Sequence, residues 1–133
     1  MIYEYPVEQI TDLVTRPGST PETRVVSEPW AVKVHRLQMV LTIPAGFEFD
    51  LDSVPRLPLV YLLFKGRSGL RAPCLHDFLY QEQPPTTTRL EADMAYWDAM
   101  RSFGVPLLWA AFHFLGVRLG GWRGWRKYRR GES

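Results

Sequence analysis

The spacing of apolar and polar residues changes character near the middle of the chain. Between Trp30 and Asp50, the segments WAVKVHRL and QMVLTIPAGFEFD alternate apolar and polar residues around a PAG turn. Such alternation is typical of strands with one buried face, so we expect a small antiparallel sheet over about residues 30–50. Residues 1–29 are polar and rich in turn formers, which predicts an irregular N-terminal arm.

Beyond Asp50 the apolar spacing lengthens to about 3.6 residues, which predicts three or four packed helices and hence an α+β fold. The expected helices cover about residues 53–65, 70–82, 88–103 and 106–119. Thr88 stands three residues before Glu91, which is the spacing of a capping box. The last helix is apolar all round, so we expect it to be central and covered on every side.

Length and composition favour one domain without export. A chain of 133 residues forms one ordinary domain, here ending in a basic tail at about 120–133. The net charge is +2, and the single Cys74 excludes an internal disulfide, so we expect a buried structural thiol. The N-terminus lacks a signal-peptide pattern. The apolar run at 105–117 is shorter than the roughly 20 residues that a membrane span needs.

Two of the expected helices each carry one carboxylate on an apolar face. At about 100° per residue, Asp77 falls in the middle of the apolar arc of the 70–82 helix, and His76 falls at its edge. Asp93 falls between Trp97 and Met100 on the next helix by the same count. A buried carboxylate needs hydrogen-bond donors, a cation, a metal or a raised pKa, because an uncompensated one is costly.

Two interpretations of these carboxylates stay open. In the first, Asp50, His76, Asp77 and Asp93 form an acid–base set, or Asp50, His76 and Asp93 bind a divalent cation with Asp77 as base. In the second, they form a satisfied structural network. The supporting positions in either case are Ser53, Tyr80, Arg89 and His113. The zincin, nucleophile-elbow and phosphate-loop signatures are missing.

The basic tail interleaves cations and aromatic side chains. Its candidate contact residues are Arg118, Trp122, Arg123, Trp125, Arg126, Lys127, Tyr128, Arg129 and Arg130. This pattern suits phosphate contacts with base stacking, an anionic membrane surface or an acidic partner. It equally suits a solvated basic end whose aromatic side chains pack back on the core.

The order of the segments GFEFDLDSVP, LHDFLY and TRLEADMAYWDAM resembles the family of unknown function numbered 1353, small proteins of tailed phages and prophages. The resemblance covers roughly residues 47–116. It implies that Asp50, His76, Asp77 and Asp93 act as a set, and it implies a phage setting without naming a reaction. The chain departs from the family pattern at His113, where the family usually has an Arg.

Three functions follow as expectations. The first is a structural or assembly component of a tailed-phage or prophage particle, which binds other virion proteins and resides in the virion or the bacterial host cytoplasm. The second is a metal-dependent hydrolase of cell-wall or nucleotide substrates that uses the Asp and His cluster. The third is nucleic-acid binding through the basic tail.

Overall fold

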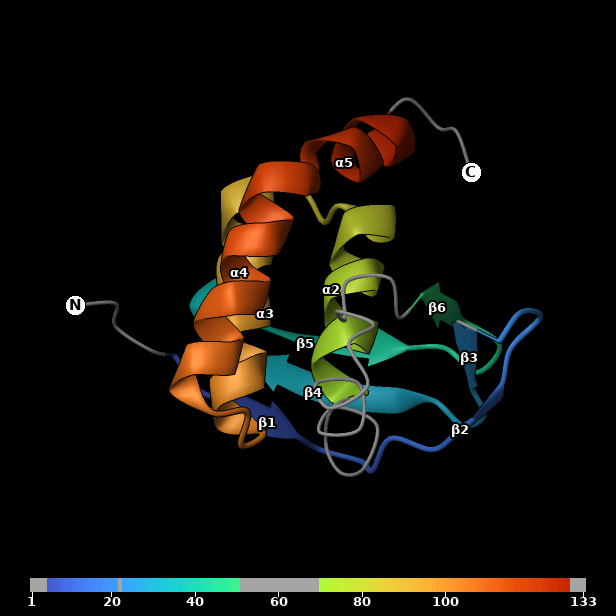
Figure 1. Cartoon of the computed structure of the whole chain (residues 1–133). Coiled ribbons are helices and arrows are strands. Elements are labelled where there is room, and N and C mark those ends of the chain that lie inside the picture. The colour runs from blue at the N-terminus through green and yellow to red at the C-terminus, as the bar shows by residue number, and fades with distance from the viewer. Residues whose placement is uncertain (1–4, 22, 51–69, 130–133) are drawn as a thin grey trace.

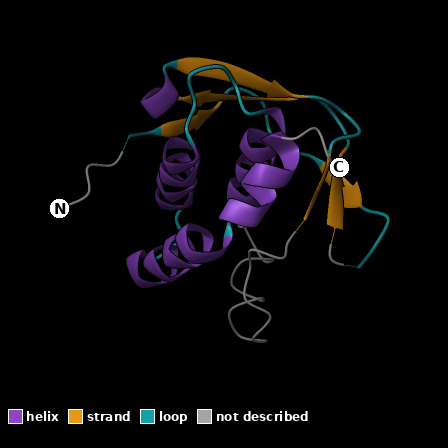
Figure 2. Cartoon of the chain, turned by 90° about the horizontal axis from the view of Figure 1, so that it is seen from above, coloured by secondary structure: helices purple, strands orange, loops and turns teal. Residues whose placement is uncertain are grey.

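The structure, a computed structural model, describes residues 5–21, 23–50 and 70–129. These ranges contain two antiparallel sheets of three strands each and four α-helices, which confirms the α+β fold class. The strands lie along one side of the molecule and the helices pack against them (Figures 1 and 2).

In the described residues, all the strands precede the α-helices along the chain. The strands are β1 (Val7–Gln9), β2 (Thr15–Pro17), β3 (Thr23–Val26), β4 (Trp30–Val34), β5 (Met39–Ile43) and β6 (Glu48–Asp50), with a 3-10 turn, η1 (His35–Leu37), between β4 and β5. The helices are α2 (Arg71–Glu82), α3 (Arg89–Ser102), α4 (Leu107–Gly120) and α5 (Trp122–Arg129). The helices expected at 70–82, 88–103 and 106–119 are therefore confirmed, and the one expected at 53–65 lies outside the described residues.

Each sheet combines two strands that are consecutive in sequence with a third strand that is distant. One sheet has the order β1-β4-β5, with Val7 opposite Val34 and Val34 opposite Met39. The other has the order β2-β3-β6, in which Val25 pairs with Glu48. The described part of residues 1–29 thus holds three strands, and the expectation of an irregular arm is wrong. Strands of three or four residues are too short to show a reliable alternation.

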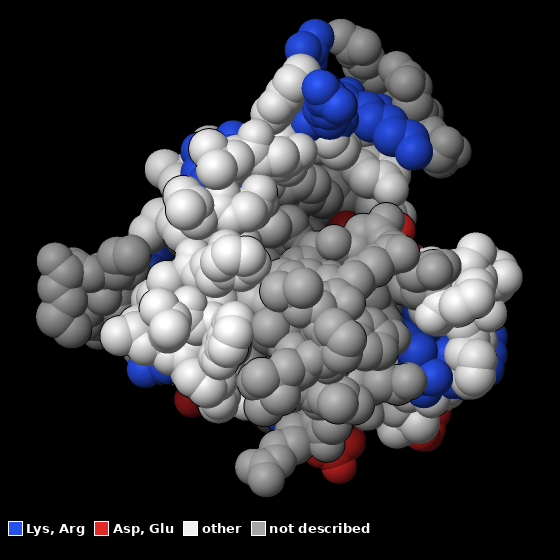
Figure 3. Space-filling view, viewed as in Figure 1, with Lys and Arg blue, Asp and Glu red and all other residues white. Residues whose placement is uncertain are grey.

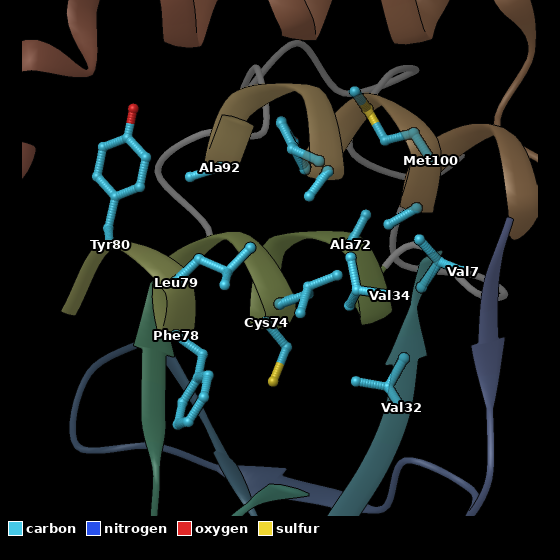
Figure 4. Close-up of a cluster of buried hydrophobic side chains, with 14 of the residues drawn as sticks. Val7, Val32, Val34, Ala72, Cys74, Phe78, Leu79, Tyr80, Ala92 and Met100 are labelled. Carbon is cyan, nitrogen blue, oxygen red and sulfur yellow. The ribbon is translucent and has the colours of Figure 1, made fainter. Parts of the chain in front are cut away.

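Helix α2 lies between the strands and α3, and its side chains form the centre of the core. Figure 4 shows Cys74 and Phe78 pointing from α2 toward the strands, with Leu79 on the side of α3. Cys74 is fully buried, as expected of a structural thiol. Burial, followed by the negative charge of Asp77, raises the pKa of its thiol well above the ordinary value, so the thiolate is disfavoured.

Local capping fixes the start of α3. The Thr88 hydroxyl accepts a hydrogen bond from the backbone amide of Glu91 at 3.1 Å, and the Glu91 carboxylate accepts one from the Thr88 amide at 3.0 Å. This reciprocal pair is the capping box that the sequence predicts. Gly104, with φ of 90°, follows the end of the helix in a conformation that favours glycine.

Helix α4 is not the central helix that its apolar sequence predicts. Only Ala110, His113 and Val117 of α4 are buried, whereas Leu108 is 76% exposed and Leu119 is 72% exposed. One stripe of α4 packs on α3, and the opposite side faces outward (Figure 1). Because α2 and α3 already cover the sheets, α4 forms an outer layer. None of the helices in the described ranges has the length and hydrophobicity of a membrane-crossing segment.

Candidate active site

The centre of the candidate site is a contact between two neighbouring helices. The Nε2 atom of His76 on α2 lies 2.9 Å from Oδ1 of Asp93 on α3. Both side chains are buried, and the His76 ring contacts the rings of Tyr80 and Tyr96, with centroids 4.3 and 4.5 Å away. The imidazole is therefore held in one orientation by a hydrogen bond to a carboxylate and by contacts with two aromatic rings.

Three further donors surround Asp93. The Tyr80 hydroxyl donates to Oδ1 at 2.6 Å, while Arg118 donates to Oδ2 at 2.7 Å and Arg89 at 3.5 Å. Arg89 also donates to the carbonyl oxygens of Val117 and Arg118, at 3.1 and 3.2 Å. The buried carboxylate thus has its hydrogen bonds satisfied, and the same cations tie α3 to the last turn of α4.

These contacts set the protonation state of the site. Burial raises the pKa of Asp93, but the hydrogen bonds from His76 and Tyr80, the charge of His76 and the hydrogen bond from Arg118 outweigh it, so the pKa lies below its ordinary value. Burial and the contact with Asp93 raise the pKa of Tyr80. At neutral pH, Asp93 is an anion and Tyr80 is a neutral donor.

An open cleft of about 560 Å³ runs along the His76 side of this network. Its polar lining comes from β6, α2 and α4, and its other wall comes from the glycine-rich junction of α4 and α5. The lining residues are Asp50, His76, Asp77, Tyr80, Phe112, His113, Gly116, Val117, Gly120, Gly121, Gly124 and Tyr128. The volume lies in the range of small-molecule sites, which is roughly 300–1,000 Å³. Asp93 does not line the cleft, and the two cleft residues that contact it are His76 and Tyr80.

Two carboxylates stand at the polar end of the cleft. The backbone amide of Asp50 donates to Oδ2 of Asp77 at 2.7 Å, which connects the end of β6 to α2. Burial raises the pKa of Tyr128, and the charges of Asp77 and Asp50 raise it further. The cleft therefore carries negative charge at Asp50 and Asp77, and Tyr128 of α5 lines it as a neutral phenol.

Gly121 permits the close approach of α5 to the site. A Cβ atom on Gly121 would lie 2.5 Å from the Tyr80 hydroxyl and 2.5 Å from the Val117 carbonyl oxygen. Trp125, one turn later, packs edge-on against the Tyr80 ring at a centroid distance of 5.2 Å. The α4–α5 corner is thus fitted around Tyr80, so a side chain at residue 121 would push the two apart.

Comparison with known proteins gives one match. The sequence matches the family DUF1353, described as a protein of unknown function, over residues 24–117. The chain belongs to the DUF1353 family. No curated protein and no solved structure matches it. The family match ends at Val117, so the α4–α5 corner and all of α5 lie beyond it.

In this DUF1353 chain, three of the four expected site residues reach the cleft and the fourth supports one of them. Asp50, His76 and Asp77 line the cleft, whereas Asp93 lies behind His76. Tyr80 and Arg89 contact Asp93, and His113 lines the cleft from α4. Ser53 lies outside the described residues.

The burial of His76 and Asp77 is the reverse of what the helical periodicity predicts. His76 is buried, and Asp77 is only half-buried at the cleft. The prediction assumed that one apolar side of the helix is the buried side. In the structure, α2 is buried from Ala72 to His76 and again from Phe78 to Tyr80. On a helix surrounded by neighbours, an apolar arc does not identify the core side. The burial of Asp93 follows the count.

The donors around Asp93 occupy both of its oxygen atoms, so they leave little room for a metal ligand there. Among the described residues, no group of three or more His, Cys, Asp and Glu side chains is arranged to hold a metal ion. The two carboxylates that face the cleft, Asp50 and Asp77, are oxygen ligands of the type that Ca²⁺ and Mg²⁺ take. Cation binding by the expected ligand set of Asp50, His76 and Asp93 stays a prediction.

The basic tail divides into an inner and an outer set. Arg118 donates to Asp93, Trp125 is buried against Tyr80, and Tyr128 lines the cleft. Arg123, Arg126, Lys127 and Arg129 are exposed on α5. Trp122 is 42% exposed, and Arg130 lies outside the described residues. The segment expected to be a tail is thus a helix that completes the cleft.

A second buried carboxylate on α3 was not among the residues that the sequence patterns predict. Asp98 is fully buried and accepts hydrogen bonds from Arg36 of η1, at 2.6 Å to Oδ2 and 3.1 Å to Oδ1. The backbone amide of Tyr5 also donates to Asp98. This pair joins α3 to the sheet, away from the cleft. Arg36 is 62 residues distant in sequence, so no local pattern could reveal it.

Proposed function

We propose that this protein is a hydrolase in which His76, oriented by Asp93, activates water for attack on an acyl carbon held in the cleft. The observation that carries the proposal is the double position of His76. Its Nε2 faces a buried carboxylate at 2.9 Å, and the same ring lines an open cleft. A base oriented by a third group and open to substrate is the general arrangement of a water-activating or nucleophile-activating His.

Asp93 determines which nitrogen of His76 takes part. With Asp93 ionised, the proton of a neutral imidazole resides on Nε2, where it donates to the carboxylate. Nδ1 is then the nitrogen that accepts a proton. Asp93 also stabilises the imidazolium that forms, so it acts as a positioning residue and does not touch the substrate.

The reaction balances with water as the only second reactant. The water oxygen forms a bond to the acyl carbon while His76 takes one water proton. The bond from that carbon to the leaving oxygen then breaks, and His76 returns the proton to the leaving alkoxide. The products are a carboxylic acid and an alcohol, and His76 is regenerated.

A purely structural role explains less of the geometry. A network that only holds α2 to α3 needs Asp93, Tyr80 and the two arginines, but it needs neither a cleft nor a His at its floor. Membership of a phage particle, with virion proteins as partners, stays a prediction. So does nucleic-acid binding, whose expected contact set loses Arg118 and Trp125 to the interior.

The test measures p-nitrophenol release from p-nitrophenyl butyrate by the full chain, with His76→Gln as the central variant. General-base catalysis contributes about 10²–10⁴-fold, so we expect kcat to fall by about that factor. The matched control is His35→Gln, which removes a half-exposed His on η1 and should leave kcat unchanged. Equal rates for wild type and His76→Gln would sink the proposal.

Tyr80→Phe covers the case in which His76→Gln does not fold. It removes the 2.6 Å hydrogen bond to Asp93 but keeps the ring that packs on His76 and Trp125. We expect a smaller loss of kcat than for His76→Gln, with a shifted pH profile, because the carboxylate loses a donor. A folded Tyr80→Phe protein with wild-type kcat and wild-type pH profile would count against a catalytic His76.

A separate arm tests the divalent cation. The same assay is run with EDTA and then with added Ca²⁺ or Mg²⁺, for the wild type and for Asp77→Asn. A cation at the carboxylate end of the cleft would be supported if EDTA abolishes wild-type hydrolysis and an added cation restores it, while the cation restores no hydrolysis in Asp77→Asn. If EDTA leaves the wild-type rate of hydrolysis unchanged, the reaction does not depend on a bound cation.

A further inference from the structure

The outer side of α4 carries an exposed apolar surface. Its exposed large side chains are Leu107, Leu108, Phe112, Leu115 and Leu119. From Leu108 to Leu119 these positions recur at intervals of three or four residues, so they lie on one side of the helix, and Leu107 adds to the surface at its first turn. No charged residue interrupts the sequence from Leu107 to Val117. A contiguous apolar surface of this kind marks an interaction site.

Cations border this surface at the end where α4 meets α5. Arg123, Arg126, Lys127 and Arg129 are exposed on α5, and Trp122 stands at the corner. Figure 3 shows the uncharged surface over α4 and the blue side chains of α5 on the same face of the molecule. The described residues of α4 and α5 contain no Asp or Glu, so the border is positive only.

The apolar surface and the cleft share a wall. Phe112 is 55% exposed on the outer side of α4 and also lines the cleft. Gly116, one turn later, is exposed and lines it too. Neither Phe112 nor Gly116 carries a polar side chain, so the wall that the cleft shares with the outer side of α4 is apolar at these two positions.

We infer that α4 and α5 dock on an anionic lipid bilayer and that the cleft hydrolyses an acyl ester of a lipid in that bilayer. This inference rests on the hydrolase function proposed above. A helix with an apolar face lies in the bilayer interface with that face buried about 5–10 Å, and basic and Trp residues favour such docking on anionic lipids. The combination of exposed leucines, a Trp and cations fits this chemistry.

A bilayer fits these residues better than nucleic acid does. Contacts to phosphate would use the arginines of α5 but would leave the leucines of α4 in water, where they gain nothing. On a bilayer, the leucines enter the acyl region while the cations of α5 meet the headgroups. Both halves of the surface then have a partner, and Phe112 lies where an acyl chain would leave the bilayer for the cleft.

The chemistry at the bilayer is the step already described, with a lipid ester as the acyl donor. Water adds to the ester carbonyl carbon, the bond to the glycerol oxygen breaks, and that oxygen takes the proton that His76 removed from water. The products are a free fatty acid and a lysolipid. The apolar wall of the cleft receives the acyl chain beside the ester.

Cosedimentation with phosphatidylglycerol vesicles and with phosphatidylcholine vesicles tests the docking by itself. We expect wild-type protein to bind the anionic vesicles at least tenfold more tightly. Leu108→Ser combined with Leu119→Ser should lose that binding, and Arg126→Glu combined with Lys127→Glu should lose the preference for anionic lipid. The matched control is Val40→Ser, which removes an apolar side chain that is 54% exposed on β5, and it should bind like wild type.

Fatty-acid release from the same vesicles tests the substrate class. We expect the Leu108→Ser, Leu119→Ser protein to lose this release while it still hydrolyses dispersed p-nitrophenyl butyrate, whereas His76→Gln should bind vesicles and hydrolyse neither substrate. If wild type cleaves p-nitrophenyl butyrate but neither binds vesicles nor releases fatty acid, the lipid inference is overturned and the hydrolase stands. If neither wild type nor any variant cleaves either substrate, the proposed hydrolase function is wrong. Vesicle binding without cleavage would then show a lipid-docking protein that does not catalyse this reaction.

Sedimentation velocity distinguishes a second copy of the chain on the same surface. A wild-type dimer that the Leu108→Ser, Leu119→Ser protein converts to a monomer, without vesicle binding by either, would assign the α4 surface to self-association and overturn the lipid inference. A wild-type monomer that binds anionic vesicles supports it.

Discussion

The imidazole of His76 and the carboxylate of Asp93 meet at 2.9 Å across the contact between α2 and α3, and only the imidazole also reaches the cleft. The carboxylate is closed off by Tyr80, Arg89 and Arg118, so each partner has a separate environment. One residue of the pair can meet a substrate, and the other can only hold it in place.

Asp93→Asn should lower the free energy of unfolding strongly, because it removes the charge of a fully buried carboxylate from the half-buried guanidinium groups of Arg89 and Arg118. Breaking a buried ion pair from one side costs about 3–5 kcal/mol. Urea denaturation with the midpoint and slope fitted separately measures the change. Asp12→Asn, which removes an exposed carboxylate, is the control and should leave the midpoint unchanged. A loss for Asp93→Asn as small as that of the control would contradict the network.

Stability should fall on acidification through the titration of Asp93. Its pKa in the folded state lies below the ordinary value of 3.8, so the unfolded state binds more protons between the two pKa values. The stabilising contribution is complete above the unfolded pKa and is lost as the pH falls through the folded one. Thermal melts from pH 6 to pH 2 should therefore show a steeper decline for wild type than for Asp93→Asn. Parallel declines would be inconsistent with a lowered pKa.

Gly121→Ala should destabilise the protein, whereas Gly116→Ala should stabilise it. The added methyl group at residue 121 meets the Tyr80 hydroxyl and the Val117 carbonyl, while one at residue 116 has no neighbour within 4 Å. Overpacking costs about 1–3 kcal/mol, and replacing a mid-helix glycine by alanine gains about 0.5–1 kcal/mol. Thermal denaturation measures both. Equal shifts in the two variants would show that the α4–α5 corner does not pack closely on Tyr80.

Arg36→Ala should destabilise the fold without a specific effect on the hydrolytic reaction. It leaves the fully buried Asp98 without its guanidinium partner, at a cost of about 3–5 kcal/mol. Because Asp98 and Arg36 lie away from the cleft, p-nitrophenyl butyrate hydrolysis per folded molecule should match wild type below the melting temperature. A fall in kcat for folded Arg36→Ala protein would mean that the two buried carboxylates of α3 are coupled.

Thr88→Ala should cost about 1 kcal/mol, because it removes one half of the capping box at the start of α3. Asp93 lies one turn further along the helix, inside its hydrogen-bonded body, so the rate of ester hydrolysis should not change. Denaturant midpoints measure the first effect and initial rates measure the second. An unchanged midpoint would show that other contacts hold this helix end.

The sequence by itself determined the features that depend on near neighbours. The helices at 70–82, 88–103 and 106–119 follow from apolar spacing, and the start of α3 follows from Thr88 and Glu91. The burial of Asp93 follows from its position between Trp97 and Met100. Periodicity and capping operate within one or two turns, so these features are encoded in a few adjacent residues.

Only the tertiary structure decided what those elements contact. The pairing of β1 with β4, the position of α4 outside the core and the burial of His76 in place of Asp77 all depend on neighbours that are distant in sequence. Arg118 donates a hydrogen bond to Asp93, which is 25 residues distant in sequence. A residue expected to belong to the basic contact surface therefore supports the site. An apolar face indicates that a helix is driven to bury that face. Which element packs against it depends on the packing of all the elements together.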